Sequence, residues 1–320
     1  MPVPHTGTNA CATSMASILE QLPRGARVAV IRLRSLGDCV LTTPALEIMK
    51  RSRPDLEVAV VVEGRFAAVF EGHPEVDAVL GPRVAEVAGW RPQLCLNLHG
   101  GTRSLLLAAL SGARWRAGFA HFQWGFVHNV KIPRAQEILG VERKVHTAEH
   151  LASAMFYLGA ERCEIPRAKL YVEGQGKTGV GKTGVLPYVV MHPVASAPDK
   201  TWPAERFLAV ARRLGRECVF IGAADDDLSA FGEFRRVQGA PLGEVKRLLA
   251  GAGLFVGNDS GPAHLAAALG VPAVVIFGAS EPEVWGPWKA SAETVVARGA
   301  IGEVSAEEVL AAVERLGVPA

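Results

Sequence analysis

Cysteine is scarce in this 320-residue chain, and no pair of cysteines has the spacing of a metal or redox site. The five cysteines, at positions 11, 39, 95, 163 and 218, are scattered and odd in number, which predicts reduced thiols in a cytoplasmic protein. No stretch offers the roughly 18 uninterrupted apolar residues that a membrane-spanning helix needs. The first residues contain no basic region followed by an apolar run, so no signal peptide is expected.

The chain also lacks an excess of charge of either sign. It has 34 basic and 32 acidic residues, a formal charge of +2, which predicts no general attraction to nucleic acid. With 49% hydrophobic and 21% charged residues, the composition is typical of a folded globular protein. A length of 320 residues is too great for one small core and fits two domains of ordinary size.

Short apolar runs rich in β-branched residues alternate with helical patterns along the chain. The runs cover residues 27–33, 58–62, 76–80, 94–98, 188–192, 218–221, 254–257 and 273–277. Helical patterns stand at residues 38–50, 203–214, 226–235, 242–249, 261–269 and 305–316, the last with a capping box of Ser305 and Glu308. Near-continuous apolar runs are typical of parallel strands buried on both faces. The alternation therefore predicts an α/β protein with two Rossmann-like, doubly wound domains that face a central cleft.

The alternation is interrupted once, by a stretch rich in Gly and Lys that contains Gly-Lys-Thr-Gly-Val twice. Such a composition is typical of an interdomain linker. We predict an N-terminal extension over residues 1–24, an N-terminal domain over 25–172, a linker over 173–186 and a C-terminal domain over 187–320.

A diphosphate-binding turn is predicted where the run at 254–257 ends. Asn-Asp-Ser-Gly follows, and a helix begins at once with a proline in its first turn, where a missing amide hydrogen is harmless. The amides of Ser260 and Gly261, with the helix dipole, suit a diphosphate, and Gly261 would let a phosphate approach the backbone closely. His264 falls in the first turn, where its ring can face the cleft. Alternatively, Asp259 or Ser260 merely caps the helix.

A second ligand-binding turn, Arg34 to Asp38, follows the first run. Open α/β sheets place their ligands at such turns off the carboxyl ends of strands. Asp38, a first-turn carboxylate, is expected either to cap its helix or to act as a general base that takes a proton from a sugar hydroxyl. If the site transfers a group between two substrates, Arg34, Ser35 and Gly37 would lie on the side of the acceptor. The turn has too few glycines for a dinucleotide fingerprint.

A loop of small polar residues, 193–201, follows the run at 188–192. Lys200 in this loop suits a mobile cation that neutralises phosphate charge on a leaving nucleotide. A solvated surface lysine is the alternative. In such a transfer enzyme, Ser196 of the same loop would lie on the side of the donor.

These motifs together resemble those of the ADP-heptose:lipopolysaccharide heptosyltransferases, glycosyltransferase family 9. Arg-Ser-Leu-Gly-Asp at 34–38, with Thr-Thr-Pro-Ala-Leu at 42–46, is similar to the N-terminal signature of the family. Asp-Lys-Thr-Trp-Pro at 199–203 resembles its Lys-x-Trp-Pro element. Asp-Ser-Gly-Pro-Ala-His at 259–264, with Phe-Gly-Ala-Ser-Glu-Pro at 277–282 and Trp-Gly-Pro at 285–287, resembles its donor-binding signature. The motifs stand in family order across residues 27–290.

The resemblance implies a GT-B fold and an inverting, metal-independent transfer of heptose from ADP-heptose to a lipopolysaccharide core acceptor. Asp38 matches the proposed general base, and Lys200 matches the phosphate-binding lysine. Asp259, Ser260 and Gly261 match the diphosphate loop, which His264 closes. The family's nucleoside-binding acidic residue falls at Asp225 or Asp226, where the match slips, and we assign Asp226. No cofactor is implied besides the donor. The implied acceptor is a lipid-anchored saccharide, so peripheral contact with the inner membrane face is expected.

Three other patterns suggest different chemistry. Residues 176–183 satisfy the P-loop pattern but lead into an apolar run instead of a helix. His146, Glu149 and His150 have the order of an inverted zinc protease motif, with no evident further ligand. The Asp triplet at 225–227 satisfies the D-x-D pattern of metal-dependent glycosyltransferases, but acidic residues there are also typical of a helix start.

The segment 119–133 is rich in aromatic and basic residues and has no clear period. It includes Trp124, Phe126, His128 and Lys131. It is expected either to face a phosphorylated or acidic acceptor or to be an ordinary packed loop.

Two further functions stay open from the sequence. A nucleotide-sugar epimerase on the same fold would convert the donor without an acceptor. A non-catalytic nucleotide-binding protein would keep the diphosphate site without turnover.

Overall fold

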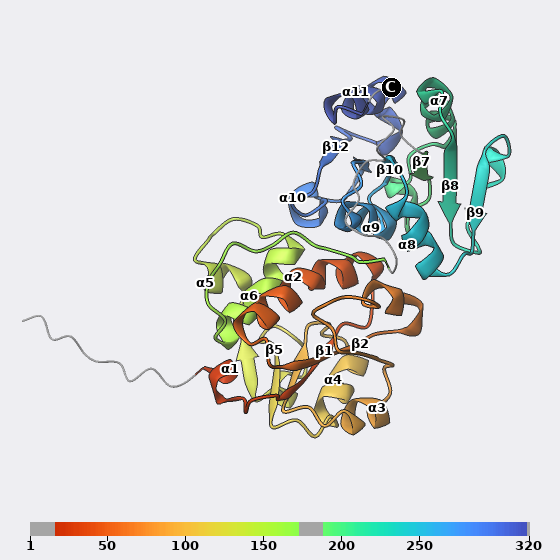
Figure 1. The fold of residues 1–320 in the computed structure, drawn as a ribbon. Coiled ribbons are helices and arrows are strands. Elements are labelled where there is room, and N and C mark those ends of the chain that lie inside the picture. Colours follow the sequence, from red (N-terminus) through yellow and green to blue (C-terminus); the bar gives the residue numbers. More distant parts are fainter. Residues whose placement is uncertain (1–16, 173–187, 319–320) are drawn as a thin grey trace, which may run out of the picture.

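Each of the two ranges that the computed structural model describes, residues 17–172 and 188–318, is built on its own parallel sheet (Figure 1). The first sheet has the order β3-β2-β1-β4-β5-β6 and the second β12-β11-β10-β7-β8-β9. Counted within each unit, both sheets have the same strand order, the doubly wound order of Rossmann folds. The predicted fold class is confirmed.

The strands of the first sheet are β1 (Arg27–Ile31), β2 (Glu57–Val61), β3 (Ala78–Leu80), β4 (Leu94–Asn97), β5 (Trp115–Phe119) and β6 (Val130–Ile132). Those of the second are β7 (Val189–His192), β8 (Cys218–Gly222), β9 (Arg235–Gln238), β10 (Leu254–Asn258), β11 (Ala273–Phe277) and β12 (Ala292–Val296). The α-helices of the first unit are α1 (Ile18–Gln21), α2 (Leu36–Ser52), α3 (Val84–Gly89), α4 (Thr102–Ala109), α5 (Ala135–Leu139) and α6 (Thr147–Leu158). The second unit has α7 (Ala204–Leu214), α8 (Leu242–Ala250), α9 (Gly261–Leu269), α10 (Pro282–Trp285) and α11 (Ala306–Arg315). Short 3-10 helices are η1 (Gly64–Val69), η2 (Gly125–Val127), η3 (Pro198–Lys200), η4 (Ser229–Phe231) and η5 (Ile301–Glu303).

Helix layers cover both faces of the first sheet. Along β1, Val28 and Val30 belong to the apolar core that includes α2 and α6, whereas Ala29 and Ile31 belong to a separate core with α3 and α4. This alternation follows from the two-residue period of a strand. Figure 1 shows α2 on the side of the second unit and the α3–α4 layer on the far side.

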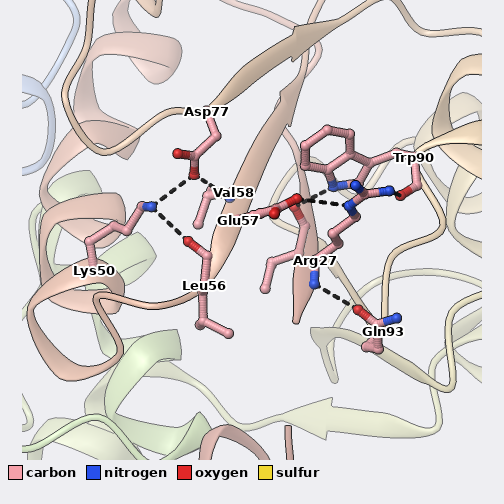
Figure 2. Close-up of polar contacts among 9 residues, drawn as sticks. Arg27, Lys50, Leu56, Glu57, Val58, Asp77, Trp90 and Gln93 are labelled. Atoms are coloured by element: carbon pink, nitrogen blue, oxygen red, sulfur yellow. Dashed lines mark hydrogen bonds and ion pairs between the residues drawn. The ribbon is translucent and has the colours of Figure 1, made fainter. Parts of the chain in front are cut away.

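The amino-terminal edge of the first sheet is fixed by side chains (Figure 2). The Lys50 amine donates to the Leu56 carbonyl at 2.6 Å and to Asp77 Oδ2 at 2.8 Å. At the start of β1, Arg27 pairs with Glu57 and lies 5.0 Å from the centre of the Trp90 ring. These contacts join the strand starts, opposite the carboxyl edge at which α2 begins.

The two units meet through α2 and α9. Around these helices, hydrogen bonds to main-chain carbonyls also join the units. The buried Lys246 amine of α8 donates to the carbonyls of Ala68, at 2.5 Å, and Glu71, at 3.2 Å. Trp288 Nε1 donates to the Pro166 carbonyl at 2.8 Å, and the Leu170 amide donates to the Ala268 carbonyl at 3.2 Å.

Most predicted elements are confirmed, and the differences have local causes. Helix α9 has the predicted bounds, and Ser305 and Glu308 form the predicted capping box of α11. The helix expected at 226–235 is wrong: the turn leads into η4 and then into β9. Strand β9 is an edge strand with mostly exposed side chains, so it lacks an apolar run. Strands β5, β6 and β12 were not predicted either. The predicted linker and the P-loop pattern lie outside the described residues.

Candidate active site

Two helix N-termini, one from each unit, face each other at the carboxyl edges of the two sheets. Helix α2 begins after β1 and helix α9 after β10, and the two helices are in contact. A Cβ on Gly37 would lie 2.6 Å from Cδ2 of His264, and a Cβ on Gly261 would lie 2.7 Å from the Leu36 side chain. Gly261, expected to admit a phosphate, is therefore also needed for the close approach of α2.

A cavity of about 530 Å³ lies between these helix ends. It brings together the predicted site residues from both units, which are Ser35, Gly37, Asp38, Ser196, Lys200, Asp226, Asp259, Ser260, Gly261 and His264. Arg34 is exposed and does not line this cavity, although its charge acts on the nearby ring of His99.

The N-terminus of α9 is not capped by a side chain. The hydroxyl of Ser260 instead donates to the Asn258 carbonyl at 3.0 Å and lies 3.0 Å from Nδ1 of His192. Oδ2 of Asp259 accepts from the Ser280 hydroxyl at 2.5 Å. Neither side chain therefore has the alternative capping role, and the first residues of α9 line the cavity as an uncapped helix N-terminus, which suits an anion.

Lys200 lies beside this helix end on η3. Its amine is 3.7 Å from Oδ2 of Asp259, and its side chain is 32% exposed. The loop that carries it is fixed by the fully buried Trp202, whose amide donates to Oδ1 of Asn258 at 3.0 Å. Nε1 of Trp202 donates to the Val304 carbonyl at 2.9 Å. Trp202 thus holds the loop that carries Lys200 against β10.

Asp38 caps α2 and also lines the cavity. Its Oδ2 accepts from the Ser35 hydroxyl at 3.2 Å, and its Oδ1 lies 2.5 Å from Nη2 of the buried Arg32. The capping interpretation is therefore right for the local structure, and it does not exclude the second role. Both contacts fix the carboxylate at the cavity wall.

Two further cavities adjoin the first. One of about 340 Å³ shares Asp38 and Trp285 with it and is lined by Arg32 and His99, among others. Another, of about 660 Å³, shares Leu36, His192, Asp226 and Pro262 with the first and is lined mainly by apolar residues of both units. Asp38 stands where the first and the smaller cavity meet.

Two histidines of the cavity are held neutral by burial. Desolvation lowers the pKa of His192 and of His264 to about 4, although Asp226 and Asp259, respectively, act in the opposite direction. Both imidazoles are therefore uncharged at neutral pH, and His264 contributes shape and a hydrogen-bonding ring instead of a positive charge.

The same effect predicts that acid destabilises the protein. His73 and His150 also have a pKa near 4 because they are buried. The unfolded chain binds protons at its histidines near pH 6.5 and the folded chain near pH 4, so stability falls as the pH decreases between these values. Thermal unfolding followed from neutral to acidic pH should show this fall, and His73→Gln should make it shallower. A melting temperature independent of pH across this window would contradict it.

A second prediction concerns the glycine contact between the units. Gly261→Ala should weaken nucleotide binding by about tenfold or more, because its methyl group would overlap Leu36 and push α2 from α9. Gly302→Ala is the matched control, since the nearest atom to its added methyl group lies at 3.5 Å. Calorimetric titration with ADP measures both variants, and equal affinities would contradict the prediction.

The residues of the two metal-like patterns have other partners. Glu149 accepts from both guanidinium nitrogens of Arg143, His146 lies 2.8 Å from the Gly286 carbonyl, and His150 stacks on Phe119. In the Asp triplet, Asp226 accepts from the Ala223 amide and Asp227 from the Ser229 amide. The described residues contain no group of three or more His, Cys, Asp or Glu side chains arranged to hold a metal ion.

The segment 119–133, which is rich in aromatic residues, divides into two parts. Phe122 lines the cavity of about 340 Å³ beside Asp38, His121 lines a separate cavity with Arg134 and His150, and His128 is buried against Gly118. Trp124 and Phe126 are exposed and line none of the cavities around Asp38.

Sequence reasoning missed several residues of the site. Arg32, Ser280 and Trp285 were given no role, although Ser280 and Trp285 fall within motifs that the sequence displays. Arg32 lies within the first apolar run and directly follows β1, and a basic residue just after a buried strand was the available signal.

Two facing doubly wound units with a cavity between them form the architecture of the GT-B fold, here with an uncapped helix N-terminus and a fixed carboxylate on the cavity wall. The profile of glycosyltransferase family 9 (heptosyltransferase) matches residues 92–312, more than half of the chain. The chain belongs to this family, and it is a glycosyltransferase.

Individual relatives agree with this assignment. Lipopolysaccharide heptosyltransferase 3 of Escherichia coli is 27% identical over 303 residues, which cover 80% of this chain and 84% of that protein. The solved family 9 glycosyltransferase of Veillonella parvula has a TM-score of 0.77 at 22% identity and covers 91% of this chain and 97% of its own. ADP-heptose lps heptosyltransferase II of E. coli has a TM-score of 0.75 at 19% identity, covering 91% and 98%. The two solved structures show the GT-B fold.

Proposed function

We propose that this protein transfers a heptose from ADP-heptose to a lipopolysaccharide core acceptor, with inversion at the anomeric carbon and without a metal ion. The observation that carries the proposal is the position of Asp38 across one cavity from Lys200 and the uncapped N-terminus of α9. A carboxylate and an anion site that face the same space suit a displacement in which a sugar leaves a diphosphate. The names of the relatives supply the heptose and the acceptor.

The donor would lie mainly on the C-terminal unit, residues 187–320. Its diphosphate would receive hydrogen bonds from the amides of Ser260 and Gly261 and the charge of Lys200. Its nucleoside fits the largely apolar cavity of about 660 Å³, with Asp226 at the junction of the two cavities. Ser196 would contact the donor from the loop before η3.

The acceptor would enter from the N-terminal unit, residues 25–172, on the side of Arg34, Ser35 and Gly37. The cavity of about 340 Å³ beside Asp38 is lined by Arg32 and His99 and suits a polar sugar. Asp38 would take the proton of the attacking acceptor hydroxyl while the oxygen of that hydroxyl bonds to the anomeric carbon. The bond from that carbon to the diphosphate oxygen breaks at the same time, and ADP leaves with the electron pair.

Metal independence rests on the positive groups that face the diphosphate. Lys200 and the positive end of the α9 dipole would counter the charge that develops on the leaving group, in the place of a cation. A saccharide acceptor anchored in lipid would place the enzyme at the inner face of the cytoplasmic membrane. The structure adds that none of the helices in its described part is long and apolar enough to span a bilayer.

Product analysis with ADP-, UDP- and GDP-sugars, each with and without a lipopolysaccharide core acceptor, tests the proposal. We expect ADP release from ADP-heptose that requires the acceptor and continues in a metal chelator. Conversion of the donor alone would replace the proposal with an epimerase. Donor binding without turnover under all conditions would indicate a non-catalytic nucleotide-binding protein.

A further inference from the structure

The most exposed large apolar side chains of the described residues gather on one part of the N-terminal unit. They are Phe126 at 77%, Trp124 at 64%, Leu106 at 54% and Leu110 at 51% exposure. Phe126 lies in η2 and Trp124 directly precedes it. Leu106 belongs to α4 and Leu110 directly follows it, and η2 packs against α4. We call this set of four side chains the α4–η2 patch. A group of exposed apolar side chains on one part of a surface is typical of an interaction site, whereas single exposed apolar residues are normal.

The chain around the α4–η2 patch contains no acidic residue. Asp and Glu make up 32 of the 320 residues, yet none occurs from residue 87 to residue 136. The same stretch holds the basic residues Arg91, Arg103, Arg114, Arg116, Lys131 and Arg134. All of these except Arg116 are exposed. Arg103 stands on α4 together with Leu106, and the segment that carries the patch has no acidic residue to neutralise its basic ones.

Acidic residues of neighbouring elements leave most of this charge uncompensated. Glu63 lies 3.9 Å from Arg103, a long ion pair. Glu86 on α3 accepts from the Gly81 amide and pairs with Arg83.

The segment around η2 is built to present its aromatic rings outward. Trp124 has a left-handed backbone, φ 59°, at the start of η2, and its ring meets Phe126 edge to face at 6.0 Å between centroids. Arg116 holds the segment in place, because its Nε donates to the Val127 carbonyl at 3.0 Å and its Nη1 to the Ala113 carbonyl at 3.1 Å. The arginine therefore supports the segment while both rings stay in solvent.

We propose that the α4–η2 patch docks the protein on the surface of an anionic phospholipid bilayer. Tryptophan and phenylalanine side chains favour the headgroup level of a membrane, and surrounding Arg and Lys side chains are attracted to anionic lipids. A protein partner would explain the apolar side chains as well, but the absence of acidic residues over a long segment favours a uniformly negative surface. The patch lies on the α3–α4 side of the first sheet, away from the second unit, so docking leaves the cleft open (Figure 1). This inference does not depend on the sugar that the enzyme transfers.

Flotation of the full chain with lipid vesicles tests the proposal. The wild-type protein should float with vesicles of phosphatidylcholine mixed with phosphatidylglycerol, and not with phosphatidylcholine alone. The double variant Trp124→Ser/Phe126→Ser should bind at least about tenfold more weakly. Arg103→Gln/Arg114→Gln should lose about fivefold in affinity per charge removed and bind with a weaker dependence on salt.

Tyr157→Ser/Val296→Ser is the matched control, because these side chains are 44% and 48% exposed and lie outside the patch. It should bind vesicles like the wild type. Thermal unfolding identifies variants that fail to fold, and Leu110→Ser then replaces the aromatic pair. Wild-type protein that does not float with anionic vesicles would overturn the proposal, as would equal weakening of the control variant. The proposal would also be overturned if the patch binds a second copy of the chain, that is, if the wild type is a dimer and the aromatic double variant is a monomer.

A separate assay distinguishes this proposal from the proposed function. Turnover of ADP-heptose with an acceptor freed of its lipid should be unchanged in the aromatic double variant. Vesicle binding without heptose transfer would support the docking surface and contradict the proposed function. Heptose transfer without vesicle binding would support the proposed function and contradict the docking surface.

Discussion

Replacing Asp38 by Asn is expected to lower kcat by about 10²- to 10⁴-fold, the range typical of a lost general base. The amide keeps the size of the side chain and can still accept from the Ser35 hydroxyl, so the cap of α2 is retained. It cannot take the proton of the attacking hydroxyl. ADP binding should change little, because the diphosphate lies against α9. Steady-state kinetics with ADP-heptose and a core acceptor, together with ADP titration, measure both effects.

Glu308→Gln is the matched control for this substitution. Glu308 occupies the same third position in the capping box of α11, where its carboxylate accepts from the amide and hydroxyl of Ser305. Both variants should lower the melting temperature modestly through the helix cap, and only the Asp38 variant should lose turnover. Wild-type turnover in a folded Asp38→Asn protein would leave Asp38 with a capping role alone.

Replacing Lys200 by Ala is expected to lower kcat/KM by about 10²- to 10³-fold, as when a preorganised electrostatic contact to a transition state is removed. The loss should fall on kcat and on ADP affinity, since the positive charge faces the diphosphate both before and after the sugar leaves. Lys200→Arg should restore part of the activity, because it keeps the charge with a different geometry.

Lys144→Ala provides the comparison for Lys200. Lys144 also forms an ion pair with an acidic residue, at 2.6 Å from Glu281 and across the contact between the units, but it does not line the cavity. Its removal should leave kcat/KM within about twofold of wild type, since exposed ion pairs contribute little. Equal losses in the two variants would show that Lys200 acts as a structural ion pair and not on the phosphate.

The fold was predictable where the pattern of the chain is strong. The central strands of both sheets are buried on both faces, so they stand out as apolar runs, and α9 is bounded by Gly261 and Gly270. The edge strands β9 and β12 were not predictable in this way, because each is only partly covered: β9 carries two exposed arginines, and β12 has exposed side chains at Thr294 and Val296. Strand β5 was missed because it contains Gly118, whose lack of a side chain makes room for the ring of His128.

The site could be predicted in its parts but not in its assembly. The turns at Asp38 and Ser260 each showed the residues of a ligand site, and the order of three motifs gave the family. Sequence spacing does not show that Leu36 touches Gly261, or that Trp202 fixes the loop of Lys200 to β10. It also does not show the ion pair of Arg32 with Asp38. These are contacts between segments far apart in the chain, and they depend on the packing of the two units.

The stereochemistry of the transferred sugar tests the central claim most directly. ADP-heptose would be incubated with a lipopolysaccharide core acceptor in the presence of a metal chelator, and the anomeric configuration of the product would be determined by nuclear magnetic resonance. The proposed displacement at the cavity between Asp38 and α9 predicts a heptosylated acceptor with inverted configuration. A product with retained configuration, or no transfer until a metal is restored, would contradict it.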